Sequence, residues 1–419
     1  MKSLLVRPLP ILPALLFAGL VAAEDSKPTT AKAPAVELTP EAQAAADDLS
    51  KTLPADSEAK RMLDDILKGA QLGPTDGWFA LSKSATRYGW PTLTARFDAD
   101  KDGRITREEL KLGEKDFARL DRDSDGSLSE RDFDWSEPTM GRSPANFVFG
   151  RGDQDGNGKV TAEEFQQLFE HLGGGADGYL SLDEIREQLQ PPAPPPPAAK
   201  TAAAAPTSSA RPADAPSPST LVLGLQRQEI GSLQPGPAVE SVAPDFTLKS
   251  LTGDEVTLSR EVGDKPVVLI FGNFTCGPFR SQAGNIEKFA KRYEGRAKIF
   301  LVYVREAHPQ DGWWMNSNRK IGIDPKQPQS DAERREIAQT CQRHLDLDVP
   351  FLVDNTDDKV GAQYSGMPNR LYLIDQQGKI AFKNARGPFG FKLRELEQAL
   401  ILLLKETEGG KDVAGTPGA

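Results

Sequence analysis

Three short acidic segments in the first half of the chain have side chains whose types and spacing could bind a metal ion. Each has acidic or amide residues at positions 1, 3 and 5, glycine at 6, an apolar residue at 8 and an acid at 12. This is the EF-hand pattern, in which these oxygens and the backbone carbonyl of position 7 replace the water shell of Ca²⁺. The predicted ligands are Asp98, Asp100, Asp102, Arg104 and Glu109 in the first loop, Asp121, Asp123, Asp125, Ser127 and Asp132 in the second, and Asp153, Asp155, Asn157, Lys159 and Glu164 in the third.

Asp and Gly also dominate solvated turns, so one such match alone would be a weak indication. Three matches over twelve residues, each flanked by apolar residues such as Phe97 and Leu120, favour metal binding. Asp132 is one methylene shorter than Glu, which predicts weaker binding in the second loop. A fourth copy has Gly173 and Gly175 at positions 1 and 3, so we expect it to pair with the third loop and to bind poorly.

A cysteine in the second half of the chain could carry thiol chemistry. Cys276 follows the apolar segment Pro266–Phe271 and precedes Gly277 and Pro278, which places it in a predicted turn from strand to helix. Unpaired N–H groups and the helix dipole stabilise a thiolate there, so we expect its pKa to be lowered. Phe279 stands three residues on, where a dithiol motif would have a second cysteine. A buried structural cysteine is the alternative.

The chain has one other cysteine, Cys341, on a helix predicted from Asp331 to His344. Two cysteines in an exported protein could form a structural disulfide. Cys341 could instead be a resolving thiol that pairs with Cys276 during turnover, or an inert buried residue. These three alternatives remain open from the sequence.

The elements that must position Cys276 alternate between strand and helix. Strands are predicted at 245–251, 255–258, 266–271, 298–304, 349–353, 370–375 and 379–383, and helices at 277–293, 331–344 and 393–404. This order predicts a thioredoxin-like α/β fold. In that fold Pro368, just before a strand, is expected to be a cis-proline facing the cysteine.

The length of 419 residues predicts two to three domains. The net charge of −10 lies wholly in residues 91–190, which hold 23 acids and 13 bases, and this sign argues against nonspecific nucleic-acid binding. Pro and Ala supply 20 of the 28 residues at 191–218, a composition typical of an extended tether.

Residues 1–23 have the basic start, short apolar run and small-residue end of a secretory signal peptide, so we expect an exported protein without a stable membrane span. Residues 24–58 lack apolar periodicity and are predicted to be a disordered lead-in. The expected organisation is then multidomain: an all-α EF-hand module at 59–190, a Pro/Ala-rich linker at 191–234, an α/β thioredoxin-like domain at 235–405 and a flexible tail at 406–419.

Three motifs of the second half are specific: the run 268–279, which ends in T-C-G-P-F, E-A-H-P-Q-D-G-W at 306–313, and R-G-P-F-G-F-K at 386–392. With R-L-Y at 370–372, they make residues 266–404 resemble the iodothyronine deiodinases. The resemblance implies a thioredoxin fold in which a selenocysteine attacks the iodine of a thyroid hormone and reductively removes it.

By this resemblance Cys276 takes the place of the selenocysteine as nucleophile, and Thr275 matches the threonine before it. His308 and Glu306 match the active-site histidine and its neighbour. Arg386 matches an arginine of the substrate site and would contact a substrate anion.

Two groups of the family's polar relay differ in this chain. Asn369 stands where the family pattern has an acid, and Gln327 stands where it has a second histidine. Sulfur also replaces selenium.

We therefore expect a thiol-dependent oxidoreductase acting on a halogenated phenol, peroxide or disulfide, with an external thiol reductant, Ca²⁺ in the loops and no organic cofactor. The alternatives are a calcium-stabilised binding or scaffold protein with an inactive redox fold, or a thiol peroxidase. The retained Cys276, Glu306, His308 and Arg386 favour the enzyme, whereas the replaced relay groups favour the binding protein.

Overall fold

A computed structural model describes residues 36–70, 83–135, 144–174, 178–180 and 215–414. The predicted signal peptide, most of the Pro/Ala-rich tether and most of the fourth loop copy lie outside these residues. No helix among the described residues is long and apolar enough to cross a membrane.

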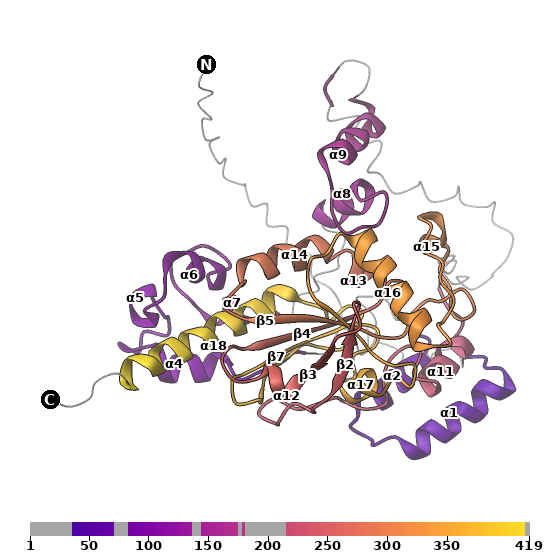
Figure 1. Ribbon diagram of the computed structural model, residues 1–419, viewed down its shortest axis with the longest axis horizontal. Coiled ribbons are helices and arrows are strands. Elements are labelled where there is room, and N and C mark those ends of the chain that lie inside the picture. Colours follow the sequence, from indigo (N-terminus) through magenta and orange to yellow (C-terminus); the bar gives the residue numbers. More distant parts are fainter. Residues whose placement is uncertain (1–35, 71–82, 136–143, 175–177, 181–214, 415–419) are drawn as a thin grey trace, which may run out of the picture. The chain divides into compact units, whose positions relative to one another are not determined.

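An eight-stranded mixed sheet, in the order β1-β8-β7-β4-β5-β6-β2-β3, takes seven strands from the C-terminal half and its edge strand β1 from the N-terminal half (Figure 1). Three of its strands run parallel as β4-β5-β6, and β7 is antiparallel to β4. β4 is buried along its whole length, as its unbroken apolar sequence requires. The strands are β1 (Ala85–Thr86), β2 (Thr247–Ser250), β3 (Glu255–Thr257), β4 (Val267–Gly272), β5 (Lys298–Tyr303), β6 (Phe351–Val353), β7 (Arg370–Ile374) and β8 (Ile380–Lys383).

Helices pack on this sheet in the order that the sequence predicts: α16 contacts β6, and α18 contacts β7 and β8. The predicted helix 277–293 is two helices, because the chain breaks at Ser281 and Gln282. The thioredoxin-like α/β fold is confirmed. Its helices are α12 (Leu258–Glu261), α13 (Gly277–Arg280), α14 (Ala283–Arg292), α15 (Asn316–Lys320), α16 (Asp331–Leu345), α17 (Lys359–Gln363) and α18 (Leu393–Ala414).

The segment that holds the acidic loops is helical, which confirms an N-terminal EF-hand region. Its first two loops are joined by a short antiparallel bridge between Ile105 and Leu128. The helices are α4 (Trp90–Phe97), α5 (Arg107–Leu110), α6 (Glu114–Leu120), α7 (Glu130–Phe133), α8 (Pro144–Gly152), α9 (Ala162–Phe169) and the π-helical turn η1 (Glu170–Gly174).

Three segments that were predicted to be unstructured contain helix. α1 (Pro40–Thr52) lies in the predicted lead-in, α11 (Pro218–Gln226) lies in the predicted linker, and α18 continues into the predicted tail. α1 and α11 contact each other and α2 (Glu58–Leu67) around a second apolar cluster. The prediction for α1 and α11 was wrong because their apolar faces, rich in alanine in α1, are buried by partners distant in sequence.

Candidate calcium loops and redox site

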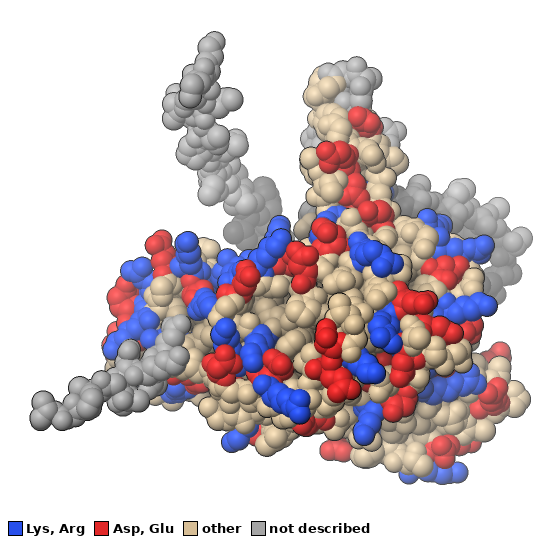
Figure 2. Space-filling view, in the orientation of Figure 1, with Lys and Arg blue, Asp and Glu red and all other residues tan. Residues whose placement is uncertain are grey.

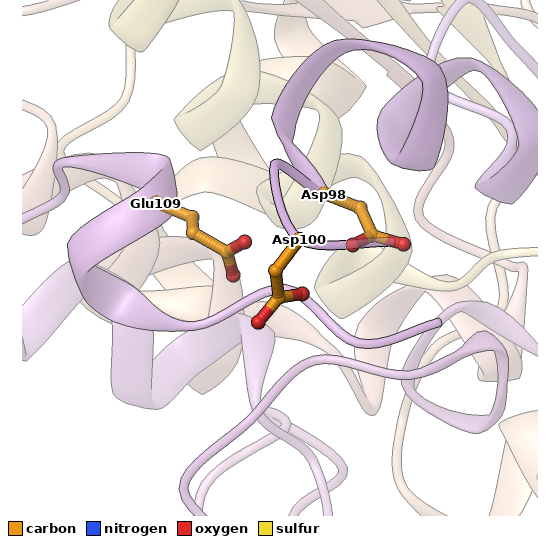
Figure 3. Close-up of side chains that lie close together, drawn as sticks. All are labelled: Asp98, Asp100 and Glu109. Atoms are coloured by element: carbon orange, nitrogen blue, oxygen red, sulfur yellow. The ribbon is translucent and has the colours of Figure 1, made fainter. Parts of the chain in front are cut away.

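In each of the three acidic loops, the residues at positions 1, 3 and 12 approach one another. Each offers a carboxylate oxygen, and these oxygens lie within 4.8 Å of one another in the sets Asp98/Asp100/Glu109, Asp121/Asp123/Asp132 and Asp153/Asp155/Glu164. Figure 3 shows the first set, with Glu109 reaching from α5 toward Asp100 on the loop. The spacing read from the sequence therefore brings the acids at positions 1, 3 and 12 of each loop together.

The turn of each loop is held by the side chain at position 5, which accepts a hydrogen bond from the backbone N–H two residues later. The distances are 2.8 Å from Arg104 to Asp102, 2.9 Å from Ser127 to Asp125 and 2.8 Å from Lys159 to Asn157. This local bond explains why the loop shape forms from a short sequence.

The first and third loops have an acceptor that suits a cation. Asp98 Oδ1 and Asp153 Oδ1, both at position 1, are buried and have no hydrogen-bond partner among the described residues. Burial, with Asp155 and Glu164 nearby, raises the pKa of Asp153 to about 6. An ion with oxygen preference would satisfy these acceptors, so the residues fit Ca²⁺.

The second loop is more fully satisfied by the protein itself. Both carboxylate oxygens of Asp121, at position 1, accept backbone N–H bonds, from Asp125 at 3.2 Å and Gly126 at 2.9 Å, whereas Asp98 and Asp153 each keep one oxygen without a partner among the described residues. Asp125 pairs with Arg104 of the first loop at 2.9 Å. The weaker binding expected for this loop stays a prediction.

Acidic and basic side chains are interspersed over the face drawn in Figure 2.

Cys276 lies where the sequence places it, between β4 and α13, but its thiol is buried. The residue is 1% exposed, and its Sγ accepts a hydrogen bond from Asn369 Nδ2 at 3.3 Å. Burial raises the pKa of the thiol to about 11, although the backbone N–H of Phe279 and the Asn369 amide act in the opposite direction. The prediction that the pKa of Cys276 is lowered is wrong for this conformation. Desolvation of the thiolate outweighs its stabilisation by the start of the short helix α13.

Glu306 and Thr275 form a buried hydrogen-bonded network beside the cysteine. Thr275 donates to Glu306 Oε2 from both its backbone N–H, at 2.9 Å, and its hydroxyl, at 2.7 Å. The hydroxyl of Tyr303 donates to the other carboxylate oxygen. Burial raises the pKa of Glu306, and these three donors act against that shift.

His308 joins the same network through its backbone. Its N–H donates to Thr275 Oγ1 at 2.9 Å. Its ring Nδ1 lies 3.1 Å from the carbonyl oxygen of Trp313, whose indole meets the imidazole edge-on at 4.5 Å. The ring is thus oriented by the E-A-H-P-Q-D-G-W segment itself.

Arg386, predicted to contact a substrate anion, is fully buried and holds a carboxylate of this chain. Its Nε lies 3.2 Å from an oxygen of Glu58 on α2, and Arg370 reaches the same oxygen at 3.7 Å. Burial lowers the pKa of Arg386 to about 10 and Glu58 acts against that shift. A substrate anion would therefore compete with Glu58.

Family comparisons agree with both parts of this description. Residues 229–403 match the family model "Iodothyronine deiodinase", and residues 95–112 and 148–169 match "EF hand". Residues 229–403 are thus similar to the iodothyronine deiodinases over the length of one domain. EF-hand repeats precede it in the chain.

Two relatives illustrate the similarity. Thyroxine 5-deiodinase from Gallus gallus is 35% identical over 134 residues, which are 32% of this chain and 50% of the relative. Type II iodothyronine deiodinase from Homo sapiens is 30% identical over 139 residues, 33% of this chain and 50% of the relative. The chain thus spans about half the length of these relatives.

A solved structure, a putative protein disulfide isomerase from Bacteroides thetaiotaomicron, aligns with 41% of this chain and 94% of its own at 22% identity and a TM-score of 0.31.

The two departures from the deiodinase pattern both lie in the site of this deiodinase-like domain. The side-chain amide of Gln327 brackets the backbone of Glu306, accepting from its N–H at 3.0 Å and donating to its carbonyl at 3.2 Å. Asn369 donates to Pro388 O at 3.4 Å as well as to the sulfur of Cys276. Neutral amides therefore support this site at both positions.

Sequence reasoning missed four residues that hold the cysteine loop. The buried Asn273 accepts from the N–H groups of Cys276 and Ala307 at 3.0 and 3.2 Å and donates to Pro368 O at 2.9 Å. Asn273 stands in the matched run 268–279, which was the one available signal. The other three are Tyr303, Arg280 and Asn318.

The remaining two predictions for this site concern Cys341 and Pro368. Both cysteines are free thiols, and burial raises the pKa of Cys341 well above its usual range. The structure therefore holds no permanent Cys276–Cys341 bridge. The Met367–Pro368 bond is cis, as predicted.

A cavity of about 460 Å³ opens beside the network. Glu306, Ala307 and Trp313 line one side, and Leu223 of α11 and Arg227, which follows the end of α11, line another. Its volume is in the range of small-molecule sites. α11 precedes residue 229, so this wall lies outside the match to the deiodinase family model.

Proposed function

We propose that this protein is an exported, calcium-binding, thiol-dependent oxidoreductase that uses Cys276 as its nucleophile. Reductive dehalogenation of a halogenated phenol is the reaction that the similarity to the iodothyronine deiodinases favours. The observation that carries the proposal is the position of Cys276 in a deiodinase-like domain, directly beside the buried network of Glu306, Thr275 and His308.

The reaction needs only groups of this chain and an external thiol. The Cys276 thiolate attacks the halogen, and a sulfur–halogen bond forms. The carbon–halogen bond breaks, its electron pair remains on the ring carbon, and that carbon takes up a proton for which His308 is the proposed donor. One external thiol then attacks the sulfur of Cys276, halide leaves, and a mixed disulfide forms. A second thiol attacks this disulfide and releases Cys276, so that two thiols supply two electrons.

Thiolate formation requires a change from the described conformation. Cys276 is 1% exposed, and its pKa of about 11 leaves little thiolate at neutral pH. Opening of the site would hydrate the sulfur and bring its pKa toward the usual value near 8.5.

The three acidic loops are the proposed Ca²⁺ sites. Asp98, Asp121 and Asp153 would provide position 1, and Glu109, Asp132 and Glu164 would close each loop. Ca²⁺ bound to the folded chain would stabilise it by mass action.

A second function, a calcium-stabilised binding or scaffold protein, is favoured by one observation, the complete burial of Cys276 with a raised pKa. In that case the cavity beside Glu306 would bind a ligand without turning it over. The two functions make different predictions for turnover.

The deciding experiment presents an iodinated phenol, a hydroperoxide and a small disulfide side by side, with a dithiol reductant. Cys276→Ser and His308→Gln are compared with Cys341→Ser as the matched thiol control. Iodide release that needs Cys276 and His308 supports dehalogenation. Peroxide turnover without iodide release would indicate a thiol peroxidase. No turnover of any of the three substrates would favour the binding or scaffold protein.

A further inference from the structure

The third acidic loop contacts the redox domain directly. The carbonyl oxygen of Gly158 accepts from the N–H of Gly284 at 3.2 Å, in the first turn of α14. Lys159 Nζ donates to Asp346 Oδ2 at 2.7 Å, and His344 Nε2 lies 3.0 Å from the carbonyl oxygen of Asp155. The loop thus contacts both α14 and the end of α16.

The fit of the loop against α13 is close. A Cβ atom on Gly158, which has φ +79°, would lie 1.9 Å from the carbonyl oxygen of Arg280 and 2.9 Å from Cβ of Ala283. Glycine is therefore required at this position twice: for the turn of the loop and for its approach to the domain.

The atoms that contact the domain are different from the predicted ligand atoms. Ca²⁺ would be held by the side chains of Asp153, Asp155, Asn157 and Glu164 and by the carbonyl of Lys159. The contacts use the carbonyls of Asp155 and Gly158 and the side chain of Lys159. Ion and domain can therefore hold the loop at the same time.

Two short connections lead from this contact to Cys276. Arg280 Nη1 donates to Phe274 O at 2.6 Å and its Nη2 to Asn318 Oδ1 at 2.7 Å, while Asn318 donates to Thr275 O at 2.8 Å. Arg280 and Asn318 thereby fix the two carbonyls before Cys276. The ring of His344 meets Phe274 edge-on at 5.3 Å.

The first loop is placed differently. It is bridged to the second loop at Ile105 and Leu128, and Arg104 pairs with Asp125. The first loop is therefore a reference for the third: it has the same ligand pattern, but it contacts the second loop where the third loop contacts α13.

We propose that Ca²⁺ in the third loop holds this loop against α13 and α14 and keeps the Cys276 segment closed. Without the ion, the carboxylates of Asp153, Asp155 and Glu164 repel one another at close range, the loop loosens, and Arg280 loses its support. Calcium then acts on the thiol through packing, and this inference rests on the proposed Ca²⁺ binding.

The test measures alkylation of Cys276 by iodoacetamide in the full chain, with the Cys276 peptide read by mass spectrometry. Millimolar Ca²⁺ is compared with a chelator and with Mg²⁺ at one pH. We expect Ca²⁺ to slow alkylation about tenfold, within the range of typical coupling between two sites. Equal rates in Ca²⁺ and chelator would overturn the proposal, and this comparison needs no variant.

Matched variants assign the effect to one loop. Glu164→Gln changes position 12 of the third loop and Glu109→Gln makes the same change in the first. We expect the Ca²⁺ effect to disappear in Glu164→Gln and to remain in Glu109→Gln, whereas the reverse result would overturn the proposal.

Because coupling is reciprocal, weakening the contact between the third loop and the redox domain should also weaken the binding of Ca²⁺ to that loop. The double variant Lys159→Ala and His344→Ala keeps every predicted ligand atom, because residue 159 would bind the ion through its backbone carbonyl. It should lower the Ca²⁺ affinity of the third loop severalfold in calorimetry. Unchanged affinity would contradict the inference. Calorimetry also separates the two proposals. Absence of Ca²⁺ binding would contradict the proposed function, whereas Ca²⁺ binding without a change in the alkylation rate of Cys276 would contradict this inference alone.

Discussion

The calcium loops and the redox site are built in opposite ways. Each loop draws its ligands from twelve consecutive residues and shapes them with local hydrogen bonds such as Arg104 to Asp102. The redox site draws residues from positions 273 to 386 and buries them: Cys276 and Glu306 are each 1% exposed. In the proposed function this difference means that a bound cation would complete the loops, whereas the redox site would have to open before its thiol reacts.

The largest effect should come from the redox side. His308→Gln should slow turnover a hundred- to ten-thousand-fold, as expected for loss of a general acid. The matched control is His171→Gln, an exposed histidine at the end of the third loop's helices, which should change nothing. Full activity in His308→Gln would show that His308 has no catalytic role.

Alkylation of Cys276 should depend steeply on pH. Because burial raises its pKa to about 11, the thiolate fraction, and with it the rate, should rise about tenfold for each pH unit between 7 and 10. Cys276→Ser gives the background from Cys341. A plateau of the alkylation rate near pH 9 would indicate an ordinary solvated thiol. It would contradict the contrast between a buried redox site and solvated loops.

Replacing Asn by Asp should impair the redox site and improve the third calcium loop. Asn369→Asp would place a carboxylate beside the buried sulfur and remove the amide donor. It should therefore raise the pKa of Cys276 further and slow alkylation about tenfold at fixed pH, equivalent to one pKa unit. Asn157→Asp adds a carboxylate ligand at position 5 of the third loop, so it should tighten Ca²⁺ binding severalfold.

Rate measurements on Asn369→Asp and calorimetry on Asn157→Asp check this pair. If both variants were neutral, the burial of Asn369 would have no electrostatic consequence, and the distinction between the two regions would be lost.

The smallest effect is expected from single loop variants. Calorimetry should count two to three Ca²⁺ ions, and Glu109→Gln should remove one. At an ion concentration of one hundred times Kd, each site contributes about 2.7 kcal/mol to the free energy of unfolding, so one lost site lowers the melting temperature by a few degrees. Absence of any Ca²⁺ heat would contradict the assignment of the loops.

Secondary structure was predictable where the pattern is local and strong. The alternation of apolar strands and helices from residue 245 onward gave the thioredoxin-like order, and Pro368 was correctly expected in cis. α1 and α11 were missed, because their weak apolar faces become recognisable only when they pack against α2.

The sequence by itself determined which carboxylates lie together in the three loops, since spacing within twelve residues fixes both the turn and the positions of residues 1, 3 and 12 around it. It also determined the position of Cys276 between a strand and a helix, and the motifs that mark the deiodinase family. These features depend on neighbours along the chain.

Tertiary structure alone decided the state of the thiol and of the anion site. Asn369 meets the Cys276 sulfur across 93 positions, Glu58 meets Arg386 across 328, and the third loop meets α14. No spacing rule predicts such contacts. Desolvation follows from the complete packing around a group, and that packing, more than the start of a four-residue helix, sets the pKa of Cys276.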